Sequence, residues 1–225
     1  MNGNLINCNF EQQKAQTLLK ADLSRKGSVD VAIVDLVNLI NAQEALFTTS
    51  SCSGRVIVFS SAQQQQQQRS DVSFADDATY DDVIVTHRKS RCRWLLAEHA
   101  PTPFTEELWS AMVAPENSGP LVLKFEPFIL HVQCRCLHTA QRLSQVAVAS
   151  AMRHSGVTIS RHSRITVAVR GTLALEVPLC AGDYRGVLVD KCYVRWLMDE
   201  CVSGKFADNQ TLIERFVTNF RAEFS

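Results

Sequence analysis

A run of hydroxyl side chains is the part of the chain whose residue types most directly suggest chemistry. Residues 47–55 read FTTSSCSGR, so four hydroxyl residues precede a cysteine, a serine, a glycine and an arginine. Hydroxyls and backbone N–H groups beside a glycine-bearing turn can hold a carboxylate, a phosphate or a ribose. Arg55 adds a guanidinium fork that suits an anion. The alternative is a hairpin whose serines satisfy only their own turn. Cys52 could act as a nucleophile only beside a base or a cation.

Two histidines and a lysine–glutamate pair further along the chain could take part in proton transfer. An imidazole exchanges protons near neutral pH, so His99 and His131 are candidates for this role. Each of them can equally be a polar contact that only supports the fold. Lys124 and Glu126 flank Phe125 and would point the same way on a strand, where they could also form a plain ion pair.

The cationic residues are unevenly distributed, although the net charge is zero. Between Glu126 and Glu176 the sequence has no acidic residue and no lysine. The arginines and histidines of this interval are Arg135, Arg142, Arg153, Arg161, Arg164, Arg170, His131, His138, His154 and His162. Such a region can bind a polyanion, or acids from other segments can balance its charge in space. Arg153, Ser155 and Gly156 follow a predicted helix and either line a pocket or cap the helix.

The length and composition favour a globular protein. At 225 residues, 46% of them hydrophobic, the chain can form one sizeable core. No apolar run reaches the roughly 20 residues that span a bilayer, and no secretory signal is recognisable, so we expect a soluble intracellular protein. The eight cysteines show neither a CxxC pair nor a zinc-site spacing. This favours reduced thiols that pack as small apolar residues, and it predicts no metal.

The hydrophobic periodicity predicts an α+β domain with a mixed or antiparallel sheet and flanking helices. The predicted strands are residues 47–51 and 55–59, joined as a hairpin, then 93–98, 128–137, 157–160, 165–170 and 174–179. On strand 128–137 one face carries Phe128, Leu130, Val132, Cys134 and Cys136, and the other carries Ile129, His131, Gln133 and Arg135.

The predicted helices are residues 10–19, a segment after Asp30, 106–112, 139–153, 190–201 and a C-terminal helix. The helix after Asp30 has Ile33, Leu36, Val37 and Ile40 on one apolar face, and Ser28 or Asp30 can cap it. The C-terminal helix has Leu212, Phe216, Phe220 and Phe224 in a stripe. Gly156 suits the left-handed position after the helix of residues 139–153.

One low-complexity segment interrupts the pattern. Residues 60–86 include six consecutive glutamines and an acidic tract, and we expect them to form a mobile insertion in a single domain of residues 1–225. The sequence contains no GxGxxG, GxxxxGK[ST], HExxH or GxSxG motif. The residues by themselves therefore identify no cofactor.

Six stretches of the sequence resemble the wybutosine-synthesising protein 3 family and occur in that family's order. They are DLSRKGSVD (22–30), FTTSSCSGR (47–55), WLLAEH (94–99), LKFEPFILHVQCR (123–135), AMRHSGVTI (151–159) and VRGTLALEVPL (169–179). The resemblance implies an S-adenosylmethionine-dependent tRNA methyltransferase. The implied fold is a compact α+β domain and not the doubly wound methyltransferase fold, which agrees with the missing GxGxxG. The implied reaction is N4-methylation of the tricyclic base beside the anticodon of phenylalanine tRNA, at the stage where this base carries an aminocarboxypropyl chain.

The resemblance also implies roles for matching residues. The implied catalytic residues are His131, Glu126 and Asp30. The implied donor-binding residues are Ser50, Ser51, Cys52, Gly54, Arg55, His99, Ser155 and Gly156. The implied contacts with the anticodon loop are Lys26, Lys124, Arg135 and Arg153. A cytoplasmic monomer is favoured, with a nuclear location left open. The alternatives are a non-catalytic RNA-binding module and a small-molecule enzyme on the same scaffold.

Overall fold

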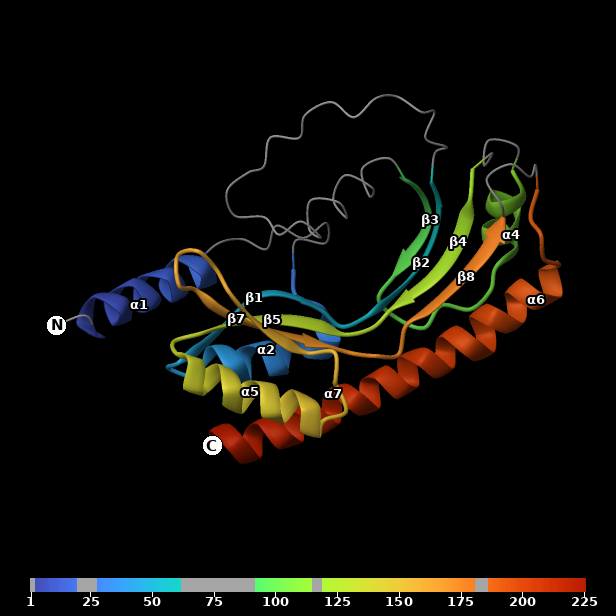
Figure 1. Cartoon of the computed structure of the whole chain (residues 1–225). Coiled ribbons are helices and arrows are strands. Elements are labelled where there is room, and N and C mark those ends of the chain that lie inside the picture. Colours follow the sequence, from blue (N-terminus) through green and yellow to red (C-terminus); the bar gives the residue numbers. More distant parts are fainter. Residues whose placement is uncertain (1–2, 20–27, 62–91, 115–118, 181–185) are drawn as a thin grey trace, which may run out of the picture. The chain divides into compact units, whose positions relative to one another are not determined.

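The computed structural model describes residues 3–19, 28–61, 92–114, 119–180 and 186–225. The chain is divided between two compact units (Figure 1). Unit 1 comprises Met1–Arg55, Glu126–Ala174 and Lys205–Ser225, and unit 2 comprises Val56–Phe125 and Leu175–Gly204. Each unit is built on one four-stranded sheet. The predicted α+β class without a doubly wound sheet is confirmed, whereas one domain over residues 1–225 stays a prediction.

Unit 1 contains sheet A, in which the strand order is β1-β5-β7-β6. The strands are β1 (Leu46–Cys52), β5 (Ile129–Cys134), β7 (Ile165–Arg170) and β6 (Gly156–Ile159). Each neighbouring pair is antiparallel. The predicted alternation along β5 is confirmed, since Leu130, Val132 and Cys134 are buried in the core. Cys136, also predicted to face the core, is exposed, because it lies beyond the end of β5.

Three helices cover the core face of sheet A (Figure 1). They are α2 (Val34–Asn41), α5 (Leu137–Ala149) and α7 (Ser203–Phe224). The predicted apolar face of α2 is confirmed, and its buried residues join those of α5, α7 and the strands in one cluster. In α7 the predicted stripe is confirmed at Phe216 and Phe220, which are fully buried.

Several helix ends differ from the prediction. Helix α1 (Gly3–Leu19) begins before the predicted residue 10. Helix α5 ends at Ala149 rather than at residue 153, and the left-handed residue that follows it is Ala151, with φ 64°. Gly156 was the wrong choice for that position, because it is already part of β6. Asp30 precedes a short 3-10 helix, η1 (Val31–Ile33), but its side chain makes no cap hydrogen bond.

Unit 2 contains sheet B, in which the strand order is β3-β2-β4-β8. The strands are β3 (Cys92–Glu98), β2 (Arg55–Ser61), β4 (Leu121–Glu126) and β8 (Leu175–Cys180). Among the described residues of unit 2, the helical elements are α4 (Glu106–Val113), α6 (Lys191–Trp196) and a π-helical turn, η2 (Leu197–Val202). Asp190 caps α6 as predicted, because its Oδ1 accepts a hydrogen bond from Tyr193 N at 2.7 Å.

The predicted hairpin of residues 47–51 and 55–59 is wrong. Strand β1 pairs with β5 in sheet A, and β2 lies between β3 and β4 in sheet B. The chain passes between the two sheets at Ser53 and Gly54, and Gly54 has φ +107°, which an L side chain rarely adopts. The predicted insertion also begins too early, because Ser60 and Ser61 belong to β2. The rest of that insertion, residues 62–86, lies outside the described residues.

None of the helices in the described ranges is both long and apolar enough to cross a membrane. Seven cysteines are free thiols, as the sequence predicts: Cys52, Cys92, Cys134, Cys136, Cys180, Cys192 and Cys201.

Candidate active site

Sheet A brings several of the predicted site residues onto one face. Directly opposed residues of antiparallel strands point to the same side of a sheet. Ser50 lies opposite His131, His131 opposite Ala168, and Ala168 opposite Gly156. A second row contains Cys52, Ile129 and Arg170. We call the side of sheet A that carries these seven residues the His131 face. It is opposite the helix-covered core face.

A hydroxyl–imidazole pair is the main polar feature of the His131 face. Ser50 Oγ lies 2.8 Å from His131 Nδ1. A β-bulge at Thr49 makes this pairing possible, because the register shifts between Thr48 and Ser50. Thr49 Oγ1 donates a hydrogen bond to His131 O at 3.3 Å. When Ser50 accepts a hydrogen from Nδ1, the lone pair of the imidazole is on Nε2, and this nitrogen can accept a proton from a substrate.

Small residues continue the row beyond His131. Ala168 and Gly156 contribute at most a methyl group each, and a Cβ added at Gly156 would meet no atom within 4 Å. Ser155 Oγ accepts a hydrogen bond from Arg170 N at 3.0 Å, which ties the start of β6 to the end of β7. The predicted donor residues Ser50 and Gly156 thus lie in the same sheet as His131, and Ser155 directly precedes β6. A Cβ at Gly156 would enter open space.

The predicted hydroxyl array is split by the strand. Because side chains alternate along β1, Ser51 points to the side opposite Ser50 and Cys52, and it pairs with the core residue Leu130. The expectation that Ser50, Ser51 and Cys52 act as one set therefore finds support only for Ser50 and Cys52. The sequence signal that separates them is the period of two in strand side-chain direction.

Arg55 and Glu126 form an ion pair. Arg55 Nε donates to Glu126 Oε2 at 2.7 Å, and a second guanidinium nitrogen lies 2.5 Å from the same oxygen. Both side chains are about one quarter exposed, at 24% and 27%. An anion that binds Arg55 must therefore share the guanidinium with Glu126. The alternative of a Lys124–Glu126 pair is wrong, because Lys124 lies 3.1 Å from Glu176 and Glu126 pairs with Arg55.

The connection between β1 and β2 is held by buried polar groups. Asp30 Oδ2 accepts hydrogen bonds from Ser53 N at 2.8 Å and from Ser53 Oγ at 3.0 Å. Asn209 of α7 donates from Nδ2 to Ser53 O at 2.7 Å and accepts from Phe128 N at 2.8 Å. A Cβ on Gly54 would lie 3.0 Å from Asn209 Nδ2, so the connection has no space for a larger residue.

Asn209 is a site residue that sequence reasoning missed. A signal was present, because Asn209 falls three residues after Phe206 and four before Ile213, in the buried stripe of α7. A polar residue in the apolar stripe of a helix is expected to have a buried hydrogen-bond partner. The partners themselves, Ser53 and Phe128, could not be read from the helix.

Cys52 is poorly suited to nucleophilic chemistry. Burial raises the pKa of its thiol, and the nearby carboxylates of Asp30 and Glu126 raise it further, whereas the Gly54 backbone and Arg55 lower it. A raised thiol pKa reduces the thiolate fraction near neutral pH. The position of Cys52 therefore fits a packing or ligand-contact role.

The predicted RNA contacts lie in different environments. Arg135 pairs with Glu11 and, at 3.2 Å, with Glu44. Lys124 belongs to unit 2 and is paired as described above. Arg153 is exposed, and Lys26 lies outside the described residues. His99 follows β3 in unit 2 and is partly exposed.

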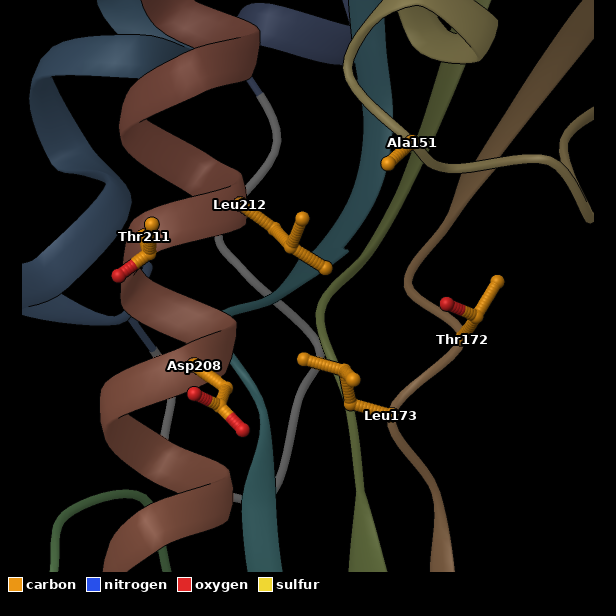
Figure 2. Close-up of a pocket in the computed structure, with 6 residues that line it drawn as sticks. All are labelled: Ala151, Thr172, Leu173, Asp208, Thr211 and Leu212. Atoms are coloured by element: carbon orange, nitrogen blue, oxygen red, sulfur yellow. The ribbon is translucent and has the colours of Figure 1, made fainter.

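Unit 1 also has an open pocket of about 280 Å³ that contains none of the predicted site residues (Figure 2). Asp208, Thr211 and Leu212 reach it from α7, Thr172 and Leu173 from the segment after β7, and Ala151 from the loop after α5. Its lining combines aliphatic groups with one carboxylate. The pocket lacks an imidazole or a cation, so the His131 face has the better groups for proton transfer.

Comparisons with known proteins place these features in context. The family described as Methyltransferase TYW3 matches residues 11–222. The tRNA wybutosine-synthesizing protein 3 homolog of Mus musculus is 40% identical over 208 residues, which are 92% of this chain and 71% of the relative. The homolog of Bos taurus is 38% identical over 212 residues, which are 94% and 72% of the two chains. The tRNA wybutosine-synthesizing protein 3 of Saccharomyces cerevisiae is 32% identical over 179 residues, covering 76% of this chain and 64% of the relative.

Two solved structures have the same fold. The PH1069 protein of Pyrococcus horikoshii aligns with a TM-score of 0.73 and 25% identity, over 95% of this chain and 96% of that one. A hypothetical protein of Aeropyrum pernix aligns with a TM-score of 0.61 and 18% identity, over 85% and 98%. The second likeness concerns the fold alone.

Proposed function

The chain belongs to the Methyltransferase TYW3 family, and from this premise we propose that it methylates a tRNA base in wybutosine biosynthesis. The proposed substrate is the tricyclic, guanosine-derived base beside the anticodon of phenylalanine tRNA, carrying its aminocarboxypropyl chain. The proposed acceptor atom is N4 of that base, and the proposed methyl donor is S-adenosylmethionine. The relatives named above, which are wybutosine-synthesizing proteins, support the pathway.

The observation that carries the proposal is the Ser50–His131 pair beside open space. Methylation of a ring nitrogen that bears hydrogen requires a group that takes the proton, and an imidazole is suited to this. Ser50 orients the imidazole by its contact of 2.8 Å with Nδ1. We assign proton acceptance to Nε2 of His131 and orientation of the ring to Ser50.

The residues of the His131 face fit a donor of this kind. S-adenosylmethionine supplies an electrophilic methyl group when it is bound. The open space at Gly156 lets a flat group approach the backbone of β6, and the Ser50 hydroxyl offers a hydrogen bond. The role of the chain is to hold the acceptor nitrogen and the donor in line, which by itself contributes much of a catalytic rate.

Asp30 and Glu126 have a supporting part in this proposal. The Asp30 carboxylate accepts two hydrogen bonds from Ser53, and Oε2 of Glu126 is bound by Arg55. These contacts favour a role in holding the β1–β2 connection and the start of β5. His131 therefore remains the first choice among the three residues assigned to catalysis.

The first prediction concerns His131→Ala. We expect the variant to lose at least about a hundredfold in methyl transfer, the range typical of a general base. The assay combines the protein, labelled donor and phenylalanine tRNA from a strain blocked at this step, followed by mass analysis of nucleosides. His138→Ala, an exposed residue of α5, is the matched control and should retain activity.

Three results would change the proposal. A folded His131→Ala protein with the wild-type rate would remove His131 from the mechanism. A wild-type protein that binds the tRNA but adds no methyl group would favour the RNA-binding module. Methyl transfer to a small molecule with no response to tRNA would favour the small-molecule enzyme.

A further inference from the structure

Arg170 is a cation on the His131 face that has no assigned role. Alternation along β7 places it on the same side as Ala168, the residue opposite His131. It lies directly opposite Ile129, two residues before His131 on β5. The Cβ atoms of such diagonal neighbours are about 7 Å apart, within the reach of an arginine side chain.

The charge of Arg170 is available to a ligand. The residue is exposed, and within the described part of the chain no carboxylate pairs with its guanidinium. Three other arginines of unit 1 do have carboxylate partners. Arg55 is paired with Glu126, Arg135 with Glu11 and Glu44, and Arg142 with Glu223. An exposed guanidinium in an interval without acids is a good binding partner for a carboxylate or a phosphate.

The backbone at Arg170 is held in place independently of its side chain. Arg170 N donates to Ser155 Oγ, and Gly171 N donates to Phe128 O at 2.8 Å. Gly171 packs closely, since a Cβ there would lie 3.0 Å from Pro127 Cβ. A change of the Arg170 side chain should therefore leave the fold intact.

We infer that Arg170 binds the α-carboxylate of the methyl donor. The inference rests on the proposed function, in which the donor's methyl group lies near His131. A short aliphatic chain joins the sulfonium to its carboxylate, so the carboxylate must lie on the same face as the reacting atoms. We assign to Arg170 the anion-binding role that the sequence suggested for Arg55. The Arg55 guanidinium already pairs with Glu126, whereas no carboxylate of the described residues pairs with Arg170.

The test compares two ligands and three variants by calorimetry. S-adenosylhomocysteine retains the α-carboxylate, and 5′-methylthioadenosine lacks the whole amino-acid part. Arg170→Gln should weaken S-adenosylhomocysteine binding about ten- to a hundredfold, the size expected for a charged hydrogen bond, and leave 5′-methylthioadenosine binding unchanged. Arg170→Lys should give an intermediate affinity, because it keeps the charge but loses the fork. Arg221→Gln, which removes an exposed charge from the last turn of α7, should match the wild type.

The outcomes separate this inference from the proposed function. If Arg170→Gln weakens both ligands equally, or neither, while the wild type binds donor and methylates tRNA, only the Arg170 assignment fails. If Arg170→Gln leaves donor affinity unchanged but reduces the salt dependence of tRNA binding, Arg170 contacts a phosphate and the carboxylate assignment is wrong. If the wild type binds neither ligand, the proposed function fails and this inference fails with it.

Discussion

Two cysteines of unit 1 differ in the protonation that their surroundings favour. Burial raises the pKa of the Cys52 thiol. The pKa of the Cys136 thiol is lowered, mainly by hydrogen bonds with the Thr139 side chain and backbone at the start of α5. Alkylation requires the thiolate, so a lowered pKa speeds the reaction near neutral pH and a raised pKa slows it.

We predict that iodoacetamide modifies Cys136 well before Cys52 in the folded protein near neutral pH. Raising the pH should accelerate the reaction of Cys52 more than that of Cys136, because the thiol with the raised pKa has more thiolate still to gain. Peptide mass spectrometry after timed quenching measures both rates. The unfolded protein in urea is the control, in which the two rates should converge. Faster modification of Cys52 in the native state would contradict its assignment as a packing or contact residue.

At the residue scale, the sequence predicts faces better than partners. The period of two along residues 128–137 was sufficient to predict that His131 points away from the core, on the face that does not carry Leu130. The Ser50–His131 and Arg55–Glu126 contacts join residues 81 and 71 positions apart, and no local pattern encodes them. Arg170 was visible only as one of several arginines. Its value as a ligand group depends on which arginines already have carboxylate partners.

At the element scale, Asn209 connects α7 to the two backbone segments that support the site. Asn209→Ala removes the donor to Ser53 O and the acceptor for Phe128 N. Both backbone groups are then left without these partners, and each such loss typically costs about 1–3 kcal/mol. We predict a loss of about 2–5 kcal/mol in the free energy of unfolding, measured by urea denaturation.

The neighbouring Gln210→Ala variant is the matched control for this prediction. Gln210 is exposed, and its Nε2 donates to Glu214 on the same helix at 3.0 Å. Such a surface contact contributes a few tenths of a kcal/mol, so the variant should resemble the wild type. Equal stability of the two variants would show that the Asn209 contacts do not hold the β1–β2 connection.

The elements were predictable to different degrees. The residue ranges of β3, β6, β7, β8 and α4 follow their sequence patterns within about two residues. The hairpin failed because two adjacent apolar runs with a glycine between them have the same local pattern whether they pair with each other or with distant strands. In this chain β1 pairs with β5, and β2 pairs with β3 and β4, so the two runs do not pair with each other. Helix α5 ends before the predicted residue 153 because Ala151 adopts a left-handed conformation, which is not expected of an alanine.

At the scale of the whole molecule, the charge distribution suggests how a tRNA would bind. The chain is neutral overall, yet residues 127–174 contain no acidic residue. Arg153 and Arg161 are exposed there, and among the described residues neither has a carboxylate partner. We predict that the affinity for tRNA falls steeply with salt. The double variant Arg153→Gln, Arg161→Gln should reduce the slope of log K against log salt by about 1.5.

Electrophoretic or fluorescence titrations at several salt concentrations measure this slope. Arg221→Gln removes an exposed charge from the last turn of α7, outside the acid-free interval, and serves as the control. The control should leave the slope near the wild-type value. An unchanged slope in the double variant would exclude both arginines as phosphate contacts without affecting the assignments on the His131 face.

The bulge at Thr49 gives β1 an unusual tolerance to a change of length. Loss of one residue from a strand normally turns every following side chain to the opposite side. Here Thr49 is the surplus residue, since Thr48 already pairs with Val132 and Ser50 with His131. A chain without Thr49 would keep Phe47 and Ser50 on the side of the sheet that carries His131. Thr48 and Ser51 would stay on the core side. Aligned relatives could therefore show a one-residue gap at this position and still present serine to histidine.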